Sequence, residues 1–60
     1  MNQEHKAWAT ACHWRWRYED YTGKATRAYY GVIMNEVLGN YDEQIMLVWR
    51  ELFPDDFGDS

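Results

Sequence analysis

The chain has 60 residues with 6 Lys or Arg, 10 Asp or Glu and a formal net charge of −4. This length permits one domain, residues 1–60, which is smaller than the domains that most enzymes need to enclose an active-site cleft. No apolar run reaches the roughly 18 residues of a membrane span, and the N-terminus lacks a basic start followed by an apolar stretch, so we expect neither a membrane span nor a signal peptide. The single cysteine, Cys12, excludes an intramolecular disulfide and is typical of a reducing, cytoplasmic environment.

The first predicted element is a helix over residues 5–21. A polar stripe at helical spacing supports it, made of Lys6, Thr10, His13, Arg17 and Asp20. An apolar stripe holds Ala7, Ala11, Trp14, Tyr18 and Tyr21, with Trp8, Cys12 and Trp16 beside it. Residues 12–18 also alternate with period two, so one arm of a β-hairpin with a turn near residues 21–24 is the alternative. The longer helical pattern and the alanines of residues 7–11 favour the helix.

The second predicted element is a helix over residues 24–38. Its apolar positions recur in steps of three, one or four residues: Ala25, Ala28, Tyr29, Val32, Ile33 and Val37. Gly39 stands where a helix commonly ends in the left-handed conformation. Gly31 lowers the helix propensity by about 1 kcal/mol relative to Ala, so we expect it to permit the close approach of another segment.

The third predicted element is a helix over residues 41–53. Asn40 is the expected N-cap, and Glu43 three residues later completes a capping-box pattern. Apolar residues follow at helical spacing, and Pro54 ends the run. Residues 55–60 are expected to form a short, solvated acidic tail.

These elements predict an all-α fold, a compact three-helix domain; an α+β fold with a β-hairpin followed by helices is the alternative. The expected core residues are Trp8, Ala11, Cys12, Ala28, Tyr29, Val32, Ile33, Val37, Ile45, Val48, Trp49 and Leu52.

Aromatic residues are unusually frequent, with 4 Trp, 5 Tyr and 2 Phe. Each aromatic side chain buries about 150–250 Å² in a core, and an interior this small does not easily enclose eleven of them. We therefore expect some to lie on the surface or in a contact with another chain.

Metal and catalytic sites are not predicted. His5, Cys12 and His13 are the only soft metal ligands, and their spacing lacks the paired ligands that zinc uses. Cys12 and His13 are adjacent and point about 100° apart on a helix, so we interpret Cys12 as a small buried residue. The motifs of phosphate loops, serine hydrolases and zinc proteases are missing from the sequence, and we expect no enzyme activity, cofactor or metal.

The segment Trp14-Arg15-Trp16-Arg17 is the most suggestive one for binding. Trp and Arg dominate the energetics of protein interfaces, and guanidinium groups beside aromatic rings also bind single-stranded nucleic acid. The alternative is an ordinary amphipathic helix that buries Trp14 and pairs Arg15 with Glu19. The negative net charge counts against nucleic acid, whose binding depends on neutralising phosphates.

Charge differs between the halves of the chain. Residues 1–30 hold five basic and three acidic residues, a net +2, whereas residues 31–60 hold one basic and seven acidic residues, a net −6. The acidic half predicts a negative surface that competes with nucleic acid for a basic groove on another protein, and an ordinary solubilising surface is the alternative.

One pattern within residues 27–54 consists of Tyr29-Tyr30-Gly31-Val32-Ile33-Met34, Glu36, Gly39, Asp42-Glu43 and Leu52-Phe53-Pro54. This pattern resembles that of small phage-encoded proteins, some of which accompany recombination functions of the NinB type. The resemblance implies a phage origin and carries over no catalytic residue. In size and charge the chain also resembles phage inhibitors such as anti-CRISPR proteins, a likeness by analogy.

The sequence therefore predicts a small acidic protein that binds and inhibits a host protein handling nucleic acid, such as a defence nuclease, a CRISPR effector or a polymerase, in the host cytoplasm. The alternatives are a nucleic-acid-binding accessory protein of phage recombination and a self-associating structural module, such as a homodimer. The expected partner-binding residues are Trp14, Arg15, Trp16, Arg17, Glu36, Asp42, Glu43, Glu51, Asp55 and Asp56.

Overall fold

The computed structural model describes residues 2–19 and 27–58 of the chain. These form α1 (Gln3–Glu19), α2 (Arg27–Leu38), α3 (Glu43–Leu52) and a short 3-10 helix, η1 (Pro54–Phe57). The predicted three-helix, all-α fold is confirmed, and residues 12–18 belong to α1, so the β-hairpin alternative is wrong. The turn expected at residues 21–24 lies outside the described residues.

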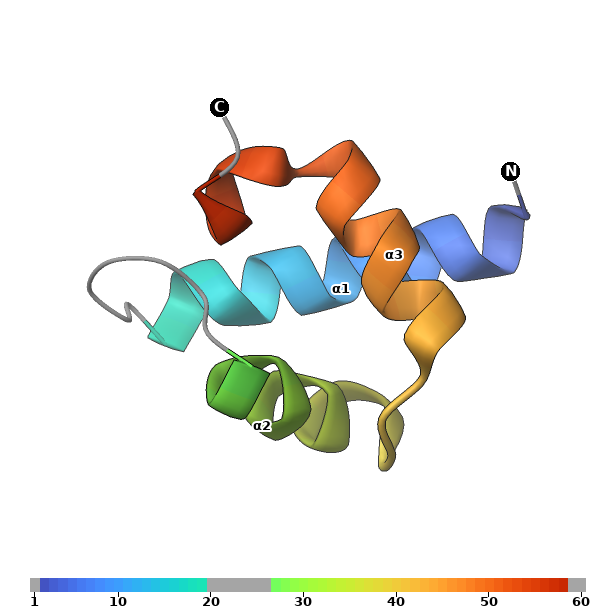
Figure 1. Cartoon of the computed structure of the whole chain (residues 1–60). Coiled ribbons are helices and arrows are strands. Elements are labelled where there is room, and N and C mark those ends of the chain that lie inside the picture. The colour runs from blue at the N-terminus through green and yellow to red at the C-terminus, as the bar shows by residue number, and fades with distance from the viewer. Residues whose placement is uncertain (1, 20–26, 59–60) are drawn as a thin grey trace.

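α1 is the central element of the fold. α3 crosses it, α2 lies along another side of it, and η1 turns back toward its C-terminal half (Figure 1). Of the helices in the described residues, none has both the length and the apolar character needed to cross a membrane.

The helix starts are set by side chains that accept hydrogen bonds from free backbone N–H groups. Asn2 Oδ1 accepts from the N–H groups of Glu4 and His5 at 2.7 and 3.2 Å, so α1 begins at Gln3 instead of residue 5. Asp42 Oδ1 accepts from Gln44 and Ile45 at 2.9 and 3.3 Å. The prediction that Asn40 caps the third helix is therefore wrong.

The helix ends agree better with the sequence than the starts do. Gly39 has φ +87° directly after α2, which is the left-handed conformation expected at this position. α3 ends at Leu52, two residues before Pro54, the residue expected to end the helix. The expectation for Gly31 is wrong, because a Cβ built at this position meets nothing within 4 Å.

The core is formed by residues from all four elements. It contains Ala9, Cys12, Trp16, Ile33, Met34, Ile45, Trp49 and Phe57. Of the residues expected there, Cys12, Ile33, Ile45 and Trp49 are confirmed, and Val37, Val48 and Leu52 are half-buried against the cluster. Trp8, Ala11, Tyr29 and Val32 are exposed, so those four expectations are wrong, and the side chain of Ala28 lies outside the described set.

The errors on α1 share one cause, which is the rotation of the helix about its own axis. The tertiary contacts turn Cys12, His13 and Trp16 toward α3 and η1. The stripe of Ala7, Ala11, Trp14 and Tyr18 lies on the opposite side of a 3.6-residue helix and faces solvent. α1 thus has apolar residues on two faces, of which only one is used in the core.

Candidate functional site

The outward face of α1 carries large aromatic side chains in an ordered helix. Trp14 is 63% exposed and Tyr18 is 81% exposed, while Ala7 and Ala11 continue the same stripe toward the N-terminus. Exposed apolar residues are normal when scattered singly, but aromatics aligned one turn apart form a continuous surface. This surface is the strongest candidate for a binding site in the described part of the chain.

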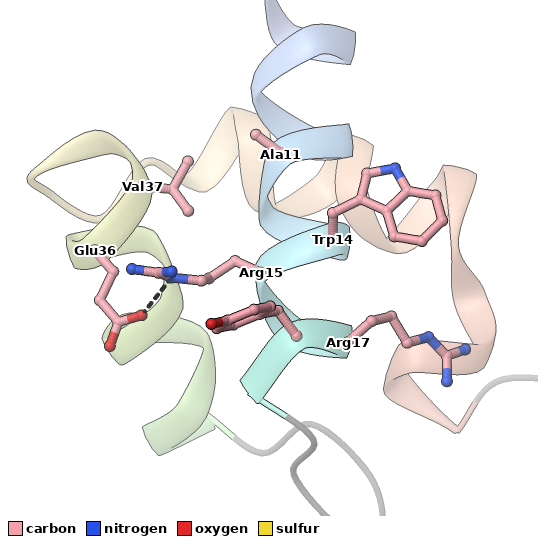
Figure 2. Close-up of a pocket in the computed structure, with 7 residues that line it drawn as sticks. Ala11, Trp14, Arg15, Arg17, Glu36 and Val37 are labelled. Carbon is pink, nitrogen blue, oxygen red and sulfur yellow. Dashed lines mark hydrogen bonds and ion pairs between the residues drawn. The ribbon is translucent and has the colours of Figure 1, made fainter.

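A shallow groove of about 650 Å³ runs along this face. Its lining consists of Ala11, Trp14, Arg15, Arg17 and Tyr18 from α1 and Glu36 and Val37 from α2. Figure 2 shows Arg15 reaching across to Glu36 on one side of α1, while Trp14 and Arg17 extend on the other. The groove is therefore a surface over α1 with α2 as one border.

Both arginines of the groove are paired with carboxylates of this chain. Arg15 Nε lies 2.9 Å from Glu36 Oε2 and 3.6 Å from Glu19 Oε1, which confirms the expected Arg15–Glu19 pair. Arg17 Nη2 lies 3.3 Å from Asp56 Oδ1. The Arg15 pairs are partly exposed and contribute little to stability, about 0–1 kcal/mol, whereas the carboxylate that meets Arg17 is buried. All of these pairs offset positive charge at the groove.

A buried polar cluster lies on the inward face of α1, opposite the groove. Asp56 is only 2% exposed, and its Oδ2 accepts hydrogen bonds from His13 Nδ1 at 2.6 Å and from Trp49 Nε1 at 2.9 Å. The imidazole of His13 also stacks on Phe53, with ring centroids 3.8 Å apart and planes 8° from parallel. These contacts join α1, α3 and η1, and they hold the helix that presents Trp14.

The structure separates the residues predicted to bind a partner. Trp14, Arg15, Arg17 and Glu36 meet at the groove. Trp16 is 3% exposed and belongs to the core, so its side chain does not offer the expected contact. The solvated position expected for Asp56 is also wrong, because the side chain is buried in the polar cluster.

The remaining acidic candidates do not line the groove. Asp42 is used as the N-cap of α3, and Glu43 accepts a hydrogen bond from the Tyr41 hydroxyl at 2.7 Å. Glu51 and Asp55 are exposed on α3 and η1. The acidic half of the sequence therefore does not form one negative surface around the groove.

Sequence reasoning missed three groove residues, namely Ala11, Tyr18 and Val37. The signal was present, because Ala7, Ala11, Trp14 and Tyr18 are spaced by four, three and four residues. That spacing indicates a helix face that packs against something. Only Ala11 of this stripe was among the expected core residues, and Trp14 was predicted to bind a partner.

The Cys12 thiol and the His13 imidazole do not line the groove. Burial raises the pKa of the Cys12 thiol to about 11, so at neutral pH it is an uncharged core residue, as expected. Within residues 2–19 and 27–58, no group of three or more His, Cys, Asp or Glu side chains is arranged to hold a metal ion.

Neither a family model nor a curated protein nor a solved structure matches this chain. The function is therefore inferred from the groove itself.

Proposed function

We propose that this chain is a small helical protein-binding domain that acts by binding and not by catalysis, and that its contact surface is the α1 groove. The observation that carries the proposal is the exposure of Trp14 and Tyr18, at 63% and 81%, on one face of an ordered helix. Trp and Tyr are the side chains that contribute most to protein interfaces when they are desolvated. The single reduced Cys12 favours action in a cytoplasmic environment.

A protein partner suits the groove better than nucleic acid does. Each phosphate that binds there must compete with a carboxylate already paired to Arg15 or Arg17. The net charge of −4 adds a repulsive field at long range. An apolar partner surface needs neither arginine and gains from covering the two rings.

The second candidate function is to bind, through the acidic half of the chain, a protein that handles nucleic acid. It is favoured by Glu43, Glu51 and Asp55, which are exposed on α3 and η1. In this form the protein is an inhibitor that occupies a basic groove of its partner, and association is fast and sensitive to salt.

Two multiple variants distinguish the candidates in capture experiments with a cell lysate. Trp14→Ala combined with Tyr18→Ala removes the groove aromatics, and both side chains are exposed, so the fold is expected to survive. Glu43→Gln, Glu51→Gln and Asp55→Asn neutralise the acidic positions. We expect the aromatic variant to lose the proteins captured by the parent and the acidic variant to keep them.

The opposite pattern would move the contact to the acidic surface. Circular dichroism melts of both variants serve as the control for folding. A mobility-shift titration of the parent with single-stranded DNA and RNA, repeated across salt concentrations, checks the nucleic-acid alternative, and tight salt-dependent binding there contradicts a protein partner.

A further inference from the structure

We infer that the partner on this face is a second copy of the chain, with the two α1 helices packed antiparallel. The inference rests on the proposed function, since it names the occupant of the same groove. Ala7, Ala11, Trp14 and Tyr18 are all exposed and follow one another at the alternating four- and three-residue spacing of a two-helix seam. A helix that pairs with a second helix exposes such a stripe when the partner is absent.

The order of small and large residues makes this seam complementary to itself. The alanines occupy its N-terminal half and the aromatics its C-terminal half. An antiparallel register that sets Ala11 opposite the second copy's Trp14 also sets Ala7 opposite the second copy's Tyr18. The twofold axis repeats both contacts, so each large ring meets a small methyl group along the whole seam.

A parallel arrangement fails on size and on the helix dipoles. It brings Trp14 against the second copy's Trp14 and leaves the alanines facing each other across a gap. It also sets the two helix dipoles side by side in the same direction, whereas the antiparallel arrangement opposes them.

The surface available suits a weak, concentration-dependent dimer. With about 150–250 Å² per aromatic side chain, the exposed fractions of Trp14 and Tyr18 leave roughly 300 Å² in each copy, or about 600 Å² in a pair. Stable specific interfaces bury at least about 1,200 Å², so the two rings reach about half of that area, and the dimer is expected to be weak.

Sedimentation equilibrium of the full chain across concentration tests the dimer directly. We expect the mass to rise from the 7.3 kDa of one chain toward twice that value. Ala11→Arg places a charge at the centre of the seam on an exposed position, and we expect it to raise the dissociation constant at least about tenfold. The matched control is Leu47→Arg, which puts the same side chain on a residue that is 50% exposed on α3 and leaves the dimer intact.

Cysteine cross-linking tests the orientation. A mixture of Ala7→Cys and Tyr18→Cys chains is expected to form a disulfide between the two variants, because the antiparallel seam sets these positions opposite each other. Neither variant alone should cross-link efficiently through its new thiol. The native Cys12 is buried and does not interfere.

A mass that stays at one chain at every concentration overturns the inference, and so does a dimer that Ala11→Arg leaves as tight as the parent. Efficient cross-linking of Ala7→Cys with itself overturns the antiparallel arrangement. A monomeric parent whose captured proteins are lost with the Trp14 and Tyr18 variant leaves the proposed function standing and removes only the second copy as its partner.

Discussion

His13 Nδ1 lies 2.6 Å from Asp56 Oδ2, although the two residues are 43 positions apart in the chain. The pair connects the middle of α1 to η1 in the interior, and the Trp49 indole N–H donates to the same oxygen at 2.9 Å. Because both side chains are shielded from water, the position of η1 depends on this polar cluster as well as on Phe57 packing against the Trp49 ring.

We expect Asp56→Ala to destabilise the fold by about 2–4 kcal/mol, because it leaves the buried His13 and Trp49 donors without an acceptor. The free energy of unfolding in urea measures the change. Asp55→Ala is the matched control, since Asp55 is the exposed neighbour in the same 3-10 helix and should alter stability by less than about 0.5 kcal/mol. Equal effects of the two changes contradict a role for the cluster.

Trp49→Ala should destabilise the domain by about 3–5 kcal/mol and abolish cooperative thermal unfolding. Trp49 is fully buried, with its ring 4.9 Å from Phe57 and 6.0 Å from Tyr30 between centroids. Trp14→Ala removes the same side chain from an exposed position and should change the melting temperature little at a concentration where the chain is monomeric. If Trp49→Ala melts like the parent, α3 is not packed as described.

Alanine at two glycines should change stability in opposite directions. Gly31 lies in α2 with open space around its Cα, so Gly31→Ala should stabilise the helix by about 0.5–1 kcal/mol. Gly39 has φ +87°, where a Cβ is strained, so Gly39→Ala should destabilise by about 1 kcal/mol. Thermal melts of both variants measure the difference, and stabilisation by both would contradict the left-handed end of α2.

The buried Cys12 thiol should make the fold sensitive to alkaline pH. Folding raises its pKa from the ordinary 9.0 to about 11, so above pH 9 the unfolded chain releases a proton that the folded chain retains. The stabilisation of the folded state by the protonated Cys12 thiol is fully present below pH 9. It is lost at up to about 1.4 kcal/mol per pH unit as the pH rises toward 11. Urea titrations of the parent and Cys12→Ala at pH 8, 9, 10 and 11 should show their difference in unfolding free energy shrinking over this range. A constant difference contradicts the burial of the thiol.

The sequence by itself determined the helical class and most of the helix ends. The start of α3 was predictable only to within two residues, because Asn40 and Asp42 are both common N-cap residues. The backbone conformation of the folded chain makes Asp42 the N-cap. The end of α2 at Gly39 and the end of α3 before Pro54 were readable because each depends on a local backbone preference of one residue. Such local preferences act before any tertiary contact forms.

Only the tertiary structure decided which face of α1 is buried. The helix has two apolar stripes, and the one with the more regular spacing, through Ala11, Trp14 and Tyr18, is the outward one. α3 and η1 pack on the other stripe, where Asp56 accepts hydrogen bonds from both Trp49 and His13, a polar residue that periodicity assigned to solvent. Pairing a buried donor with an acceptor 43 residues away is a long-range event that no local pattern encodes. The rotation of α1 that follows from it leaves Trp14 and Tyr18 exposed at the candidate interface and takes Ala11 out of the expected core.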